Sequence, residues 1–183
     1  MNPQTDRVKE AFNAIKQQFA LMKNGVVSDT LAAMKLPHRI IWGLNLPQLK
    51  EIAAGVEPSA ELAMMLRGDK GTRESVLIAP MVMPREQVDF RGGMEWVDDA
   101  PTAEAIDIRV HTLLRHLPFA PELMEQLAAS EAPMRRYAAM RLLAGMVRSD
   151  VNRARELAEA ELASGEPLTR IPARNILDDI EWI

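Results

Sequence analysis

Apolar residues recur three and four positions apart along most of the chain, and glycine or proline interrupts the runs. This spacing is the periodicity of amphipathic helices, whereas the strict alternation typical of half-buried strands is almost nowhere visible. Pro47 opens one run, and Gly25, Gly55 and Gly68 end others, in the positions where helices begin and stop. The pattern predicts helices over residues 5–24, 28–34, 47–55, 58–68, 71–82, 84–97, 102–117, 121–129, 132–148, 151–163 and 170–181.

The longer helices begin near residues 71, 102, 133 and 170, a spacing typical of helical repeats. Segment 102–117 has Ile106, Val110 and Leu113 on one stripe and Ala105 and Ile108 on another. A helix layered between two neighbours carries apolar residues on both sides in this way. The sequence therefore predicts one all-α domain over residues 1–183, an α-α solenoid of paired helices.

Composition narrows the classes of partner. With 183 residues, a net charge of −4 and a pI near 5.5, the chain has no overall basic field, so a nucleic acid would need a local patch. The absence of cysteine excludes disulfides, a thiol nucleophile and cysteine metal sites. The first residues, MNPQTDRVKE, lack an apolar signal segment, and no later run approaches the roughly 18 apolar residues of a membrane span. We expect a cytoplasmic protein with no membrane partner.

No pattern for a metal or cofactor is present. His38, His111 and His116 have no metal-binding spacing, and no glycine-rich phosphate loop occurs, so we expect neither metal nor cofactor. The RGG sequence at 91–93 is interpreted as a turn. The methionine-rich stretches 62–66 and 79–84 are interpreted as core packing, and a soft peptide-binding groove is the alternative.

Several stretches, in their order and spacing, resemble the AlkD-type DNA alkylation repair family, which are DNA glycosylases built of HEAT-like helical repeats. The likeness spans roughly residues 38–181 and rests on WGLNLPQLKEIA (42–53), RESVLIAPMVMP (73–84), EWVDDAPTAEAIDI (95–108), LPFA (117–120) and MRRYAAMRLL (134–143). It implies a right-handed HEAT-like solenoid that curls around duplex DNA and has a cleft on its concave side.

In the family, this cleft holds an aspartate flanked by two tryptophans and an arginine. The resemblance implies that Asp107 is the catalytic aspartate and that Arg136, with Arg135 beside it, contacts DNA. A carboxylate can stabilise oxocarbenium character at the sugar, aromatic faces attract a cationic alkylated base, and arginine binds phosphate. The two tryptophan positions correspond here to Ala103 and Asn175, while Trp42, Trp96 and Trp182 fall elsewhere.

Asp107 and the arginines of the C-terminal third each allow two interpretations, one functional and one structural. Asp107 either lines a groove or is a solvated acid on a helix face, and His111, one turn later, is placed to pair with it. Arg135 and Arg136 either form a phosphate-binding ridge or belong to a solvated face with internal ion pairs. Four further arginines share this alternative: Arg141, Arg148, Arg153 and Arg155.

Together these features predict a DNA alkylation repair-like protein that binds duplex DNA in a concave groove. Because both positions lack an aromatic residue, we expect base excision to be weak or absent. Asp107 is the one residue able to support it. The alternative function is a non-enzymatic helical-repeat scaffold that binds a protein or peptide in the same groove.

Overall fold

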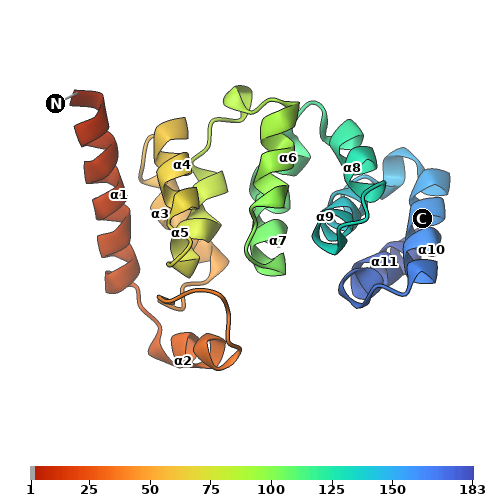
Figure 1. Cartoon of the computed structure of the whole chain (residues 1–183), viewed down its shortest axis with the longest axis horizontal. Coiled ribbons are helices and arrows are strands. Elements are labelled where there is room, and N and C mark those ends of the chain that lie inside the picture. Colours follow the sequence, from red (N-terminus) through yellow and green to blue (C-terminus); the bar gives the residue numbers. More distant parts are fainter. Residues whose placement is uncertain (1–2) are drawn as a thin grey trace. The chain divides into compact units, whose positions relative to one another are not determined.

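The computed structural model describes residues 3–183, with side chains from residue 5 onward. In this range the chain forms eleven α-helices and four short 3-10 helices, and no strand, which confirms the all-α prediction (Figure 1). One isolated parallel bridge joins Ile40 to Thr72. The chain divides into two compact units, an N-terminal unit of residues 1–87 and a C-terminal unit of residues 88–183.

The N-terminal unit packs α4 against α1 and α5, and α3 against α5. Helix α2 contributes no buried side chain. The elements are α1 (Pro3–Leu21), α2 (Gly25–Ala33), α3 (Leu46–Ala54), α4 (Ala60–Gly68), α5 (Arg73–Ile78), η1 (Ala79–Met81) and η2 (Arg85–Gln87).

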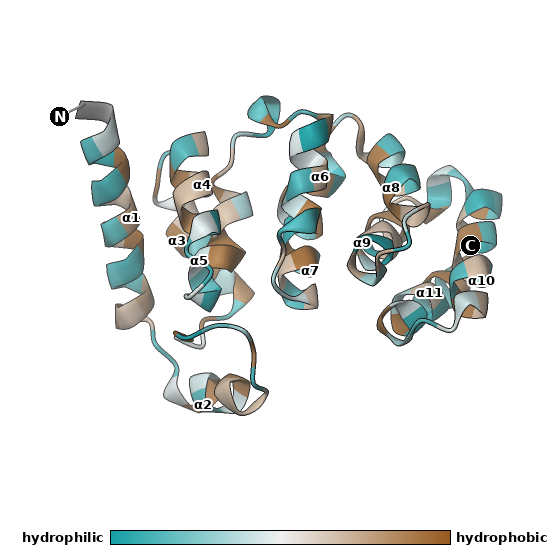
Figure 2. Cartoon of the chain, in the orientation of Figure 1, coloured by the Kyte–Doolittle hydropathy of each residue, from teal (hydrophilic) through white to brown (hydrophobic). Residues whose placement is uncertain are grey.

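The C-terminal unit is a succession of helix pairs, α6 with α7, α8 with α9 and α10 with α11 (Figure 1). Helix α9 also contacts α7 and α11, which makes it the central helix of this unit. In Figure 2 hydrophobic and hydrophilic residues alternate along these helices, as the sequence periodicity requires. The elements are α6 (Phe90–Asp98), α7 (Ala103–Thr112), η3 (Leu114–His116), α8 (Ala120–Ala128), α9 (Pro133–Ala144), η4 (Val147–Ser149), α10 (Val151–Ser164) and α11 (Pro167–Ile180).

Several observed helices are shorter than the predicted ones, because capping groups and turns set where each helix begins or ends. The predicted helix 84–97 begins only at Phe90, since the side chain of Asp89 accepts the N–H of Gly92 at 2.7 Å and caps α6. The predicted helix 102–117 leaves α geometry after Thr112 and continues as a 3-10 turn. The predicted helix 132–148 ends at Ala144, where Gly145 is the C-cap.

The interpretation of the RGG sequence as a turn is wrong, because both glycines lie inside α6. A Cβ atom at Gly93 would come within 3.2 Å of the Phe119 ring and 3.3 Å of Leu123. The missing side chain therefore lets α6 approach the start of α8 closely.

The WGLN stretch has a structural role in the N-terminal unit. The buried carboxylate of Glu74 accepts the backbone N–H groups of Trp42 and Gly43, both at 3.0 Å. The Arg73 guanidinium donates to the same carboxylate at 2.9 Å and to the Leu44 carbonyl at 3.1 Å. Gly43 has a φ of +79°, and a Cβ atom there would lie 2.5 Å from a backbone oxygen. The loop thus depends on one buried acid and one glycine.

Among the described residues, no helix combines the length and the apolar character needed to cross a bilayer.

Candidate functional site

Asp107 lies on α7 and is held by two side chains of α9. Its Oδ1 atom accepts the hydroxyl of Tyr137 at 2.9 Å and forms an ion pair with Arg141, whose Nε atom lies 2.7 Å away. The Asp107 side chain is 35% exposed, so the carboxylate is half-buried but still reached by solvent. Neither sequence-based interpretation describes it fully, because the acid lines a depression and is also ion-paired.

The depression around Asp107, called here the Asp107 depression, has a volume of about 300 Å³. Its walls come from α7, from η3 and from the C-terminal half of α9. The lining residues are Asp107, Val110, His111, Arg115, Arg141, Leu142, Ala144 and Gly145. One carboxylate therefore shares the site with two arginines and a histidine, a set better suited to binding an anion than to stabilising a developing cation.

Tyr137 and Arg115 are members of this site that the resemblance did not indicate. Tyr137 and Arg141 are four residues apart on one helix, so the spacing alone places them on the same face. Burial, together with the hydrogen bond to the Asp107 carboxylate, raises the pKa of Tyr137 from its usual value of 10.0 to about 12. The hydroxyl thus stays a hydrogen-bond donor throughout the neutral range.

This pKa predicts an alkaline loss of stability. Between pH 10 and 12 the folded protein retains the Tyr137 proton that the unfolded chain has released, so the free energy of unfolding falls as the pH rises, by about 2 kcal/mol in total. In Tyr137→Phe this contribution should disappear, and urea unfolding measured from pH 8 to pH 12 should show a shallower decline. Parallel curves for the two proteins across this window would contradict the assignment.

Arg136 does not meet Asp107. Its Nε donates to Glu161 at 3.1 Å and its Nη1 to the Glu131 carbonyl at 2.9 Å, while Nη2 lies 3.8 Å from Glu166. Glu161 is 7% exposed and also accepts the Thr169 hydroxyl at 2.5 Å. Arg136 therefore ties α9 to α10 and α11 around a buried carboxylate, and contact with DNA stays a prediction for it.

Arg135 is engaged as well. Its Nε and Nη2 donate to both oxygens of Asp98, at 2.6 and 2.7 Å. These hydrogen bonds raise the pKa of Arg135, and both side chains are partly exposed. A phosphate would have to compete with Asp98 for this guanidinium.

The remaining arginines separate into two groups. Arg153 pairs with Glu125 and Glu156, and the hydrogen bonds from Arg153 lower the pKa of Glu125. The interpretation as internal ion pairs is thus confirmed for four arginines of this region, Arg135, Arg136, Arg141 and Arg153. Arg115, Arg148 and Arg155, by contrast, are exposed and have no hydrogen-bond or ion-pair partner among the described residues.

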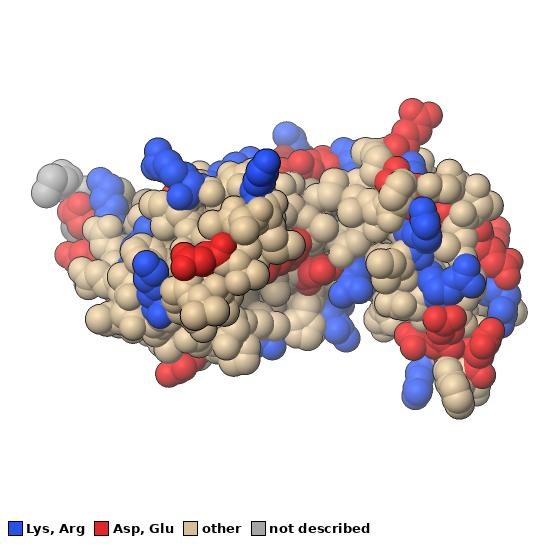
Figure 3. All heavy atoms as spheres, turned by 90° about the horizontal axis from the view of Figure 1, so that it is seen from below, with Lys and Arg blue, Asp and Glu red and all other residues tan. Residues whose placement is uncertain are grey.

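Charges of both signs are mixed on the surface drawn in Figure 3, where lysine and arginine side chains lie close to aspartate and glutamate. No broad basic area forms on that face. On that face, electrostatic attraction to a polyanion would have to come from individual cations that no acid neutralises.

The two positions where the resemblance implies tryptophan hold Ala103 and Asn175, and the tryptophans nearby in sequence differ in exposure. Ala103 is the first residue of α7, and Asn175 is exposed on α11. Trp96 is 1% exposed and packs in the core, with the Arg109 guanidinium 5.2 Å from its ring centre. Trp182, in contrast, is 90% exposed.

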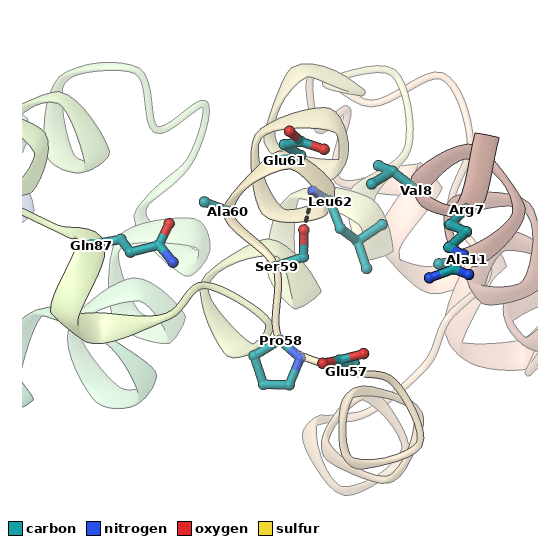
Figure 4. Close-up of a pocket in the computed structure, with 10 residues that line it drawn as sticks. All are labelled: Arg7, Val8, Ala11, Glu57, Pro58, Ser59, Ala60, Glu61, Leu62 and Gln87. Carbon is teal, nitrogen blue, oxygen red and sulfur yellow. Dashed lines mark hydrogen bonds between the residues drawn. The ribbon is translucent and has the colours of Figure 1, made fainter. Parts of the chain in front are cut away.

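A larger depression lies in the N-terminal unit, beside the start of α4 (Figure 4). It has a volume of about 490 Å³, and its walls include Arg7, Glu57, Glu61 and Gln87. The hydroxyl of Ser59, which also lines it, accepts the Leu62 N–H and caps α4. None of the residues predicted from the sequence to act on DNA lies in this depression.

Burial supports the interpretation of the methionine-rich stretch 62–66 as core packing. In the methionine-rich stretch 62–66, Leu62, Ala63 and Leu66 are buried while Met64 is exposed, which fits core packing with one exposed methionine. Among the described residues, no group of histidines and acids is arranged to hold a metal ion.

The fold and the site define a helical-repeat protein with an arginine-lined depression in its C-terminal unit. No family model matches the sequence, and no curated protein has a significant match to it. One solved structure is similar, and it is described as "A new family of proteins related to the HEAT-like repeat DNA glycosylases with affinity for branched DNA structures". The TM-score is 0.79 at 16% identity, over 91% of this chain and 74% of that one. The likeness to proteins related to the HEAT-like repeat DNA glycosylases is thus confirmed at the level of the fold.

Proposed function

We propose that this protein binds DNA through the C-terminal unit and does not excise bases. The observation that carries the proposal is the composition of the Asp107 depression, where Arg115 and Arg141 accompany a single, already paired carboxylate. Guanidinium groups bind phosphate through charge-assisted hydrogen bonds, so the depression suits a phosphate of the DNA backbone.

The pairing of Asp107 argues against excision. A glycosylase carboxylate has to stabilise positive charge that develops on the sugar, which requires a local negative potential. Arg141 lies 2.7 Å from the Asp107 carboxylate, and its positive charge opposes that potential. The aromatic walls that would bind an alkylated base are absent too, since their positions hold Ala103 and Asn175.

The phosphate contacts are assigned first to Arg115 and Arg148. Both guanidinium groups are exposed and have no partner in the part of the chain that the structure describes, so binding a phosphate costs them no internal ion pair. Arg135 and Arg136, which the resemblance indicates, are assigned to the flanks of the contact, where DNA would have to displace Asp98 and Glu161.

The similar protein belongs to a family described as having affinity for branched DNA structures, and we extend that affinity to this chain. The test compares a four-way junction, a linear duplex of the same sequence and a duplex containing 7-methylguanine. At low salt we expect the junction to bind more tightly than the linear duplex, and the alkylated duplex to bind like the unmodified one.

The same samples test excision. We expect release of 7-methylguanine no faster than without protein, and no change in that rate for Asp107→Asn. Release that depends on Asp107 would reject the non-enzymatic proposal, whereas failure to bind any of the three DNAs would reject DNA binding.

A further inference from the structure

A second depression adjoins the Asp107 depression in the C-terminal unit. It has a volume of about 430 Å³ and is called here the Trp182 depression. Ala144 and Gly145, at the end of α9, line both depressions, so the two share a boundary. The remaining lining residues are Val147, Arg148, Ser149, Asp179, Trp182 and Ile183.

Trp182 is the most exposed of the large apolar side chains in the described chain, at 90%. Its backbone N–H donates to the Asp179 carbonyl at 3.2 Å, which fixes the turn that follows α11. An indole in water offers a wide, flat surface whose burial by a second aromatic ring is favourable. Trp96 contributes to the packing of the core, whereas the exposed Trp182 side chain does not.

The groups around Trp182 are those that recognise a nucleotide. Arg148 is an exposed cation without an internal partner, suited to a phosphate. The Asp179 carboxylate and the Ser149 hydroxyl can pair with polar groups on the edge of a base. Arg115 lies across the shared boundary, since its guanidinium carbon is 3.9 Å from the position of a Cβ atom on Gly145.

We propose that Trp182 stacks on a base that is not paired in a duplex, while Arg148 and Arg115 hold the phosphates on either side of it. Stacking between a base and an aromatic side chain tolerates any sequence, because every base has a flat face. A base inside a duplex already stacks on both of its neighbours, whereas an unpaired nucleotide offers a free face to Trp182. The inference rests on the proposed function and names the DNA feature that the C-terminal unit would select, the unpaired nucleotides at a branch or end.

The test measures binding to a linear duplex and to the same duplex with a single-stranded overhang of about eight thymidines. For the native chain we expect tighter binding to the overhang DNA, accompanied by quenching of tryptophan fluorescence. Trp182→Ala should weaken binding to the overhang DNA about tenfold, because the stacking of one base is lost, and should leave binding to the blunt duplex within about twofold.

Three controls separate stacking from other effects. Trp182→Phe keeps an aromatic face and should retain much of the preference, and Ile171→Ala removes an apolar side chain that is 70% exposed on α11 and should change nothing. An overhang of abasic sites keeps the phosphates but has no bases. It should bind the native chain and Trp182→Ala equally.

The outcomes distinguish the two proposals. If neither DNA binds the native chain, DNA binding itself is rejected, and the stacking inference falls with it. If both DNAs bind but Trp182→Ala is unchanged on the overhang, or loses as much on the abasic overhang as on the thymidine one, the stacking inference is rejected while DNA binding stands.

Discussion

Replacing Glu74 with alanine is expected to lower the free energy of unfolding of the N-terminal unit by about 3–5 kcal/mol. The Glu74 side chain is fully buried and accepts hydrogen bonds from the backbone of Trp42 and Gly43 and from Arg73. Its removal leaves a buried guanidinium without this carboxylate and two amide N–H groups without their acceptors, and each of these losses is costly.

Urea unfolding of the whole chain, with hydrogen exchange at the Trp42 and Gly43 amides, measures this effect. Both amides should exchange far faster in Glu74→Ala than in the native chain. Glu51→Ala, which removes an exposed acid from α3, is the matched control and should change the free energy of unfolding by less than about 0.5 kcal/mol. Equal stability of the two variants would show that the carboxylate does not hold the WGLN loop.

Arg136→Ala is expected to destabilise the C-terminal unit by about 3 kcal/mol. The guanidinium is the cation paired with Glu161, whose carboxylate is buried between α9, α10 and α11. Arg135→Ala is the natural comparison, because the adjacent Arg135 pairs with Asp98 at the surface, where such pairs contribute no more than about 1 kcal/mol.

Thermal or urea unfolding of both variants, and of Arg136→Ala combined with Glu161→Gln, separates the two roles of Arg136. Because the glutamine carries no charge, the double variant should recover part of the stability lost in the single one. If Arg136→Ala is as stable as the native chain and only weakens DNA binding, Arg136 is a DNA contact, as the resemblance implied, and the structural assignment is wrong.

The fold could be predicted from the sequence because helix periodicity and repeat spacing survive extensive substitution. Helices α5, α7, α9 and α11 begin at residues 73, 103, 133 and 167, close to the predicted starts. The first and last residues of the helices were less predictable. They depend on single capping groups such as Asp89 and on the 3-10 turns that follow Thr112 and Ala144.

The site could be predicted only in part. The resemblance to the repair family points to Asp107, and the structure places this residue in a depression, where it forms an ion pair with Arg141. Helix α9 lies between α7 and α11, so its arginines point to different helices. Arg141 meets Asp107 on α7, whereas Arg136 meets Glu161 on α10. Which acid each arginine meets depends on tertiary packing, which a single sequence does not display.

The exposure of Trp182 was equally invisible in the sequence. Trp96 and Trp182 are both tryptophans at the C-terminal ends of helical segments, yet one is buried in the core and the other is almost fully exposed. The difference follows from what packs against each segment, and only the structure reveals the depression beside Trp182.

The most direct test of the central claim, that the exposed arginines lining the two depressions of the C-terminal unit bind DNA phosphates, is the salt dependence of junction binding. The native affinity should fall steeply as salt rises, and Arg115→Ala combined with Arg148→Ala should bind more weakly, with a slope of log K against log salt reduced by about 2. The control combines Arg155→Ala with Arg170→Ala, two exposed arginines that line neither depression, and should keep the native slope. A native affinity that does not depend on salt, or equal slopes for the two double variants, would contradict the claim.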